Sequence, residues 1–157
     1  MHITSLLSER SVLLDLDVAS KEEAIEQMVA AISRSPKVLD GAEVLRAVLE
    51  REEMASTGIG EGIAIPHAKS GKVADMLGAL AVTREPVDFQ SHDDQPVRLI
   101  FLLVGVESRV GVYLKLLSRA RRLMGNASFR KRLLQATLPS EVIDAFNEEE
   151  DRYFEAT

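Results

Sequence analysis

Hydrophobic residues in the first part of the chain follow a strand pattern and then a helix pattern. Residues 12–17, VLLDLD, are strand-like, and Ser20 follows with Glu23 three residues later, the capping-box pattern of a helix start. The next apolar residues recur at intervals of three and four, which places them on one buried helical face: Ile25, Met28, Val29 and Ile32.

A second amphipathic helix is predicted from Asp40, which has Glu43 three residues after it. Arg51 lies in the predicted last turn. The apolar stripe of this helix consists of Val44, Leu45, Val48 and Leu49. A glycine-rich segment follows directly.

The second half alternates strands with helices. Residues 76–82 and 97–105 are apolar runs typical of buried strands, and residues 86–90 alternate as a half-buried strand does. A helix from about Arg109 to Met124 has one apolar side, made of Val110, Tyr113, Leu114, Leu117, Ala120 and Met124. Gly125 can end that helix, Asn126 can cap the next, and a final helix follows Pro139 and Ser140. The pattern predicts an α/β fold, a single-domain sandwich with a mixed β-sheet flanked by helices.

Composition narrows the class of protein. The chain has 157 residues, of which 46% are hydrophobic, enough for one domain with its own core. Its longest apolar run, residues 99–106, is too short to span a bilayer, and no secretory signal is visible at the start. With no cysteine, disulfides, thiol catalysis and cysteine-bound metals are excluded. These features predict a cytoplasmic protein without membrane insertion.

The charge is unevenly spread. A net charge of −6 argues against nucleic-acid binding. Residues 109–132 nevertheless contain eight basic side chains and no acidic one. Two interpretations remain open for this segment: a solvated helix face, or a docking surface for an acidic partner.

Residues 56–69, STGIGEGIAIPHAK, combine glycines with a proline directly before a histidine. Gly58, Gly60 and Gly62 allow sharp turns and close backbone approach, whereas Pro66 disfavours a helix around His67. We therefore expect an irregular loop followed by a short extended piece with His67 at its end. The histidine could belong to a tight turn and satisfy only the backbone, or it could be functional, as loop residues on a scaffold often are.

Four kinds of site find no support in the sequence. The glycine segment lacks the Lys-Ser/Thr ending of a P-loop and the spacing of a dinucleotide fingerprint. Three scattered histidines give no zinc pattern, and a nucleophile elbow G-x-S-x-G is missing. A neutral imidazole can itself attack phosphorus, and phosphoryl transfer then needs mainly positioning and donors such as arginine. An imidazole that accepts a phosphoryl group is therefore compatible with this chain.

Residues 51–69, REEMASTGIGEGIAIPHAK, resemble the active-site segment of enzyme IIA components of the bacterial phosphotransferase system. The resemblance is to the fructose/mannitol class, which includes the nitrogen-regulatory type. It extends through SKEEAIEQM, VRLIFLLVG and YLKLLSRARRLM, and so covers nearly the whole chain.

The resemblance implies that residues 1–157 form one IIA-like phosphocarrier domain without a cofactor or metal of its own. It implies that His67 accepts phosphate from a histidine-containing phosphocarrier protein and that Arg51 steadies the phosphoryl group. Arg51 could instead only complement the helix dipole. The predicted phosphate loop comprises Thr57, Gly58, Gly60 and Gly62.

One position departs from the family pattern, because Tyr113 stands where the family usually has a second histidine, just before LKLL. A phenol can donate a hydrogen bond to phosphate but carries no positive charge near neutral pH. Tyr113 could also simply pack in the core. Three functions remain: nitrogen-regulatory signalling to a target protein, a sugar-specific IIA passing phosphate to a IIB partner, and a weakly phosphorylated binding module.

Overall fold

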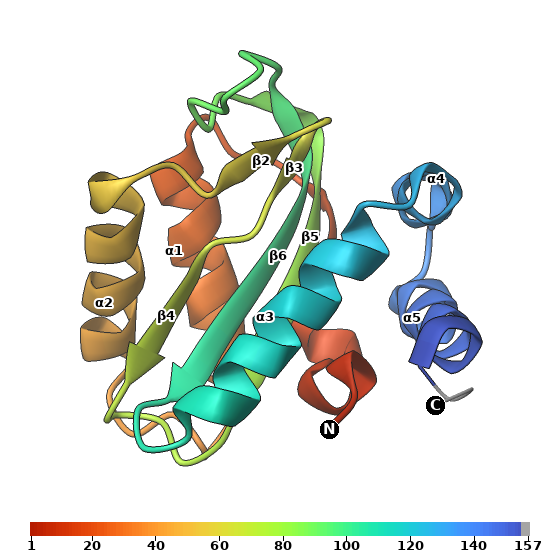
Figure 1. Ribbon diagram of the computed structural model, residues 1–157. Coiled ribbons are helices and arrows are strands. Elements are labelled where there is room, and N and C mark those ends of the chain that lie inside the picture. Colours follow the sequence, from red (N-terminus) through yellow and green to blue (C-terminus); the bar gives the residue numbers. More distant parts are fainter. Residues whose placement is uncertain (155–157) are drawn as a thin grey trace.

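A six-stranded mixed sheet forms the centre of the molecule (Figure 1). The computed structural model describes residues 1–154. The strand order is β1-β5-β6-β3-β2, with β4 also paired to β6. The strands are β1 Val12–Leu16, β2 Gly58–Gly60, β3 Ile63–Ala64, β4 His67–Ser70, β5 Leu77–Val87 and β6 Val97–Val106.

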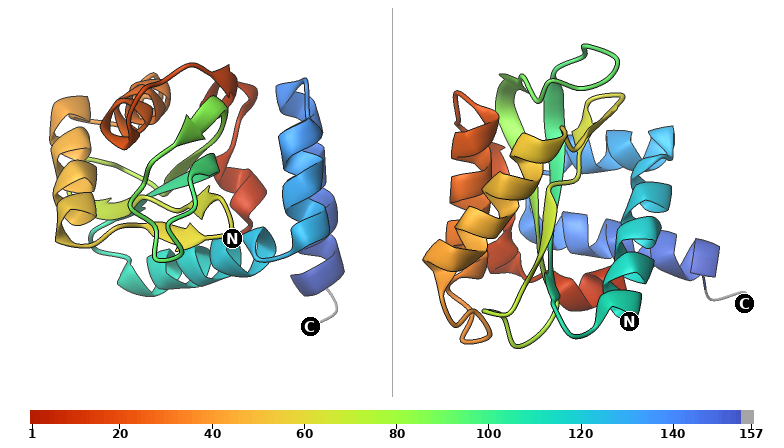
Figure 2. Two further views of the ribbon diagram at one scale, coloured as in Figure 1. Left: turned by 90° about the horizontal axis from the view of Figure 1, so that it is seen from above. Right: turned by 60° about the vertical axis from the view of Figure 1, so that its left-hand side comes forward.

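Helices cover both faces of this sheet (Figures 1 and 2). Helices α1 and α2 pack on one face, and α3, α4, α5 and the 3-10 helix η1 pack on the other. The elements are η1 Ile3–Leu6, η2 Glu9–Ser11, α1 Lys21–Ile32, α2 Gly41–Met54, α3 Val110–Met124, α4 Ala127–Gln135 and α5 Pro139–Phe154. The predicted α/β sandwich is confirmed. None of the helices within residues 1–154 combines the length and apolar character needed to cross a bilayer.

Strand β6 divides its side chains between two hydrophobic cores. Successive strand residues point to opposite faces. Leu99, Phe101 and Leu103 accordingly join the core beneath α3, α4 and α5. The alternate residues Ile100, Leu102 and Val104 join the core beneath α1 and α2. From Leu99 to Val104, where every residue is apolar, this strand is therefore the buried centre of the sheet, as predicted.

Three helix starts form as the sequence predicts, whereas the last helix begins at Pro139 itself and not after Ser140. The Ser20 side chain accepts a hydrogen bond from the Glu23 amide, Asp40 does the same for Glu43, and Asn126 for Phe129. The Glu23 carboxylate reaches back to the Ala19 amide at 3.1 Å, one residue before the expected partner. The first helix therefore has an N-terminal cap with both side chains engaged.

Two local predictions are wrong in detail. Residues 76–82 and 86–90 do not form separate strands, since β5 runs from Leu77 to Val87 with an irregular register between Val82 and Val87, and residues 88–90 belong to no strand. On α3, Leu114 is 55% exposed and Val110 is exposed as well, while Leu116 and Leu123 are buried. The buried stripe starts at Tyr113 and continues at three- and four-residue steps, so Leu114 lies about 100° away from it.

Candidate functional site

His67 is the first residue of β4, at a break in the strand that runs beside β6. Both β3 and β4 pair in parallel with β6, and Ile65 and Pro66 lie between them. Proline has no N–H to donate to a ladder, although the Pro66 carbonyl still accepts a bond from the Leu103 amide at 3.0 Å. The predicted extended piece is present, but His67 begins it rather than ends it. The side chain is 8% exposed.

The two imidazole nitrogens of His67 have different surroundings. Nδ1 lies 2.7 Å from the Ile65 carbonyl oxygen, which can only accept, so Nδ1 carries the proton and donates. In the neutral ring Nε2 then keeps its lone pair. Burial lowers the pKa of His67, and the positive charges of Arg51 and Arg121 lower it further. The hydrogen bond of Nδ1 and the lowered pKa both favour a neutral ring with an unprotonated Nε2.

Arg51 reaches the site from the last turn of α2, which packs beside β4 (Figure 1). Its guanidinium donates to the Ala55 carbonyl at 2.9 Å. Its positive charge acts on both His67 and Tyr113. It adds to the lowering of the His67 pKa, and for Tyr113 it opposes the larger effect of burial. The structure thus brings Arg51 and His67 within electrostatic reach of one another.

Tyr113 also lies near His67, in the first turn of α3. The two rings are 6.3 Å apart between centroids and tilted by 50°. Tyr113 packs against Gly105 of β6 so closely that a Cβ at Gly105 would overlap its ring. Burial raises the pKa of Tyr113 to about 12. The phenol therefore stays protonated and can act as a hydrogen-bond donor.

The glycine segment is a hairpin rather than an irregular loop. β2 and β3 pair antiparallel, and Gly60 and Gly62 adopt φ values of +96° and +79° in the turn. This turn lies away from His67, because Ile63 pairs with Leu99 whereas His67 pairs with Leu103. Four residues along a strand correspond to about 13 Å. The structure does not place the glycines of the turn beside the imidazole.

Thr57 and Gly58 lie nearer to His67, but their amides already have protein partners. The Thr57 amide donates to Glu52 at 3.1 Å, and the Gly58 amide donates to the Ser56 hydroxyl at 3.0 Å. A side chain at Gly58 would overlap Ser91, so close packing explains this glycine. The contact of this loop with a phosphoryl group stays a prediction.

Sequence reasoning missed a buried ion pair behind the site. Glu52 and Lys21 are 5% and 9% exposed, with 3.3 Å between Oε1 and Nζ. A signal was available, since the buried positions Val44 and Val48 of α2 continue at a four-residue step to residue 52. A carboxylate on the buried face of a helix requires partners.

The basic segment 109–132 binds mostly the chain's own side chains. Four of its arginines form ion pairs, namely Arg109 with Asp75, Arg119 with Glu150, Arg130 with Glu61 and Arg132 with Glu148. Arg122 lies over the Phe154 ring. Among the described residues, Lys115, Arg121 and Lys131 form no ion pair. Of these three, Arg121 acts on the pKa of His67.

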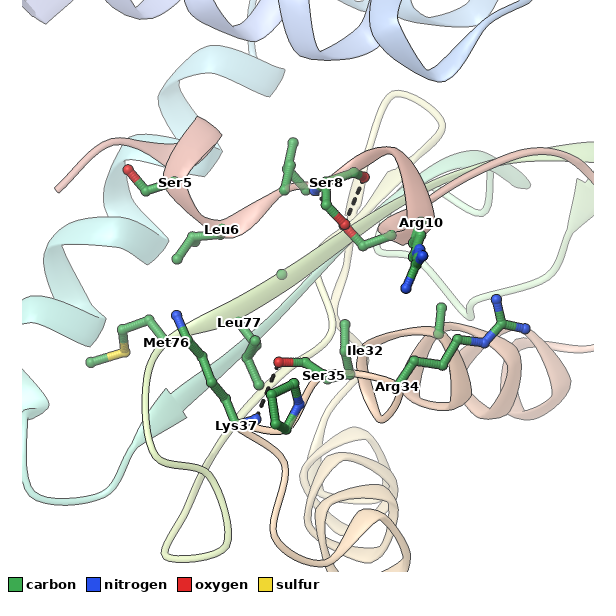
Figure 3. A pocket seen from close by; sticks show the side chains of 15 residues that line it. Ser5, Leu6, Ser8, Arg10, Ile32, Arg34, Ser35, Lys37, Met76 and Leu77 are labelled. Carbon is green, nitrogen blue, oxygen red and sulfur yellow. Dashed lines mark hydrogen bonds between the residues drawn. The ribbon is translucent and has the colours of Figure 1, made fainter.

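A cavity of about 370 Å³ lies apart from the predicted site (Figure 3). Residues from η1, η2 and the end of α1 surround it, and Leu77 and Gly78 of β5 contribute to its wall. It contains no predicted site residue. Within residues 1–154, no three histidine, aspartate or glutamate side chains gather as metal ligands.

Known proteins resemble this chain in sequence and in fold. Residues 5–149 match the family described as phosphoenolpyruvate-dependent sugar phosphotransferase system, EIIA 2. The chain is 37% identical over 148 residues to the PTS system fructose-specific EIIABC component of Bacillus subtilis, covering 94% of this chain and 23% of that protein. It is 36% identical over 133 residues to the nitrogen regulatory protein of Bradyrhizobium diazoefficiens, covering 85% of this chain and 86% of that one.

A solved structure shows the same arrangement of elements. The nitrogen regulatory protein IIA-Ntr from Neisseria meningitidis superposes with a TM-score of 0.86 at 34% sequence identity. The superposition covers 92% of this chain and 98% of that chain. The likeness therefore extends over nearly the whole fold.

Proposed function

The chain belongs to the EIIA 2 family of the phosphoenolpyruvate-dependent sugar phosphotransferase system, and on this basis we propose that it accepts a phosphoryl group on Nε2 of His67. The donor is a histidine-containing phosphocarrier protein. One observation carries this assignment: the Ile65 carbonyl fixes the proton on Nδ1 of a buried imidazole, which leaves the lone pair on Nε2.

The transfer needs no proton to move. The Nε2 lone pair attacks phosphorus, the phosphorus–nitrogen bond of the donor breaks, and its electron pair returns to the donor's imidazole. The His67 ring becomes cationic because Nδ1 keeps its proton. The hydrogen bond to the Ile65 carbonyl then has a charged donor and becomes stronger. The Arg51 guanidinium supplies positive charge to the phosphoryl oxygens.

Two downstream roles follow from the relatives. We favour nitrogen-regulatory signalling, in which a target protein recognises the phosphorylation state, because the fold agrees over nearly its whole length with the nitrogen regulatory protein of known structure. The fructose-specific relative favours a second role, transfer of the phosphoryl group to a IIB component.

One experiment tests phosphorylation and then separates these roles. The chain is incubated with phosphoenolpyruvate, enzyme I and the phosphocarrier protein, and its intact mass is recorded. A gain of one acid-labile phosphoryl group supports the carrier, whereas an unchanged mass leaves the weakly phosphorylated binding module as the better account. Adding a fructose-type IIB component to the phosphorylated chain then shows whether the group is passed on.

The pH dependence of transfer follows from the lowered pKa of His67. Only the neutral ring is nucleophilic, and its pKa lies below the ordinary value of about 6.5 because of burial and nearby arginines. We expect the single-turnover rate to stay level as the pH falls from 8 to about 6.5, and to decline only below that value. A midpoint above the ordinary histidine pKa would contradict this environment for His67.

Tyr113 is proposed to donate its phenolic hydrogen to a phosphoryl oxygen. We expect Tyr113→Phe to slow transfer by about tenfold to a hundredfold, since a hydrogen bond to a charged group contributes about 1.5–3 kcal/mol. The ring packing against Gly105 stays in this variant. Rapid-quench measurement of phosphoryl transfer tests the effect. A parental rate in Tyr113→Phe would reduce Tyr113 to a packing residue.

A further inference from the structure

Glu52 is a buried carboxylate to which the transfer chemistry assigns no step. Burying it together with the Lys21 ammonium is unfavourable unless hydrogen bonds replace the lost hydration. Lys21 supplies one bond at 3.3 Å and also donates to the Gln90 side-chain oxygen at 2.9 Å. The remaining partners of Glu52 all come from one residue, Thr57.

Thr57 is bound to both oxygens of this carboxylate. Its amide donates to Oε1 at 3.1 Å, and its hydroxyl donates to Oε2 at 2.5 Å. The end of α2 is thereby tied to the residue that opens the hairpin. Arg51, the neighbour of Glu52, also binds the segment after α2, because its guanidinium donates to the Ala55 carbonyl. Two adjacent side chains of α2 thus fix residues 55–57.

The bonds continue from Thr57 to the imidazole. The Thr57 carbonyl accepts from the Ile65 amide at 3.0 Å, and the Ile65 carbonyl accepts from Nδ1 of His67 at 2.7 Å. Glu52, Thr57 and Ile65 therefore form a continuous series of hydrogen bonds that ends on the ring. The carboxylate also acts on the ring through its negative charge, which partly offsets the lowered pKa of His67. Variants that keep this charge, such as those at Thr57, therefore test the series of hydrogen bonds by itself.

We propose that Glu52 is a positioning residue for phosphoryl transfer. By holding Thr57 it keeps the Ile65 carbonyl in place to select the Nδ1–H form of His67. This inference rests on the proposed phosphorylation of His67. The role of Glu52 differs from that of Arg51, which supplies positive charge directly to the phosphoryl group.

The test compares Glu52→Gln with Glu53→Gln, its exposed neighbour on the same helix. The side-chain amide that Glu52→Gln introduces cannot offer two charged acceptor oxygens to Thr57. We expect single-turnover transfer to fall by about tenfold to a hundredfold in Glu52→Gln, with an unchanged KM for the phosphocarrier protein. Side-chain ¹⁵N NMR of His67 should show loss of the single Nδ1–H form. Glu53→Gln should match the parent in both measurements.

A second pair of variants applies where Glu52→Gln fails to fold. Thr57→Val removes the hydroxyl donor, whereas Thr57→Ser keeps it. We expect slow transfer and an altered His67 spectrum in Thr57→Val, and in Thr57→Ser the parental His67 spectrum with faster transfer than in Thr57→Val. Equal rates in this pair, or slow transfer with an unchanged His67 spectrum, overturn the positioning role.

The NMR measurement separates this inference from the proposed function, because it needs no phosphate. A parent chain that is never phosphorylated refutes the proposed function. The spectra of Glu52→Gln still report whether Glu52 determines which nitrogen of His67 carries the proton. Conversely, a phosphorylated parent and a folded Glu52→Gln variant with parental rate and spectrum leave the function intact and refute the role of Glu52.

Discussion

Replacing His67 with alanine abolishes acid-labile phosphorylation of the chain while the fold persists. The reason for the first expectation is chemical, since Nε2 of His67 is the proposed nucleophile. The reason for the second is structural, since the ladder pairing of His67 with Leu103 is made by the backbone and stays when the side chain is shortened. The measurement is intact mass after incubation with phosphoenolpyruvate, enzyme I and the phosphocarrier protein, together with circular dichroism.

His92→Ala is the matched control, because His92 is exposed in a polar turn and distant in sequence from the site. It should be phosphorylated as fast and as fully as the parent. Full phosphate incorporation in His67→Ala would refute His67 as the acceptor and with it the proposed mechanism.

Replacing Arg51 with alanine should slow transfer by about 10²–10³, the effect of losing one donor aimed at the charge of a transition state. Arg51→Lys should recover only part of the rate, because an ammonium lacks the planar fork that binds two oxygens at once. Rapid-quench kinetics with the phosphorylated phosphocarrier protein gives both numbers.

Arg46→Ala on the same helix controls for helix stability. Arg46 forms ion pairs with Glu43 and Glu50 on the exposed side and makes no contact with His67. Its loss should leave transfer unchanged. Parental kinetics in Arg51→Ala would assign Arg51 to the helix dipole alone, the alternative that the sequence leaves open.

The sequence predicts those parts of the fold that local patterns determine. The continuous apolar run of β6, the cap at Ser20 and the stripe of α1 all depend on residues close together in the chain. The fold class follows from their order. The exposure of Leu114 could not be predicted as readily, since a stripe of apolar residues leaves the exact rotation of a helix to its packing partners.

The site was only partly predictable, for a related reason. Proline before His67 and the length of the motif single out the histidine from local sequence. The hydrogen bonds of Glu52 to Thr57 and the ion pairs of Arg119 and Arg130 join residues whose meeting depends on the whole sheet. A basic run therefore suggested a free surface, although four of its eight charges pair with carboxylates from other parts of the chain.

The fit between Tyr113 and Gly105 restricts the order in which this site can change during evolution. With tyrosine at position 113, any side chain at position 105 overlaps the ring. A lineage that acquires Tyr113 must already have glycine at position 105, and it must give up the tyrosine before that glycine can be replaced. Positions 105 and 113 are thus coupled, and a change at one of them depends on which residue stands at the other.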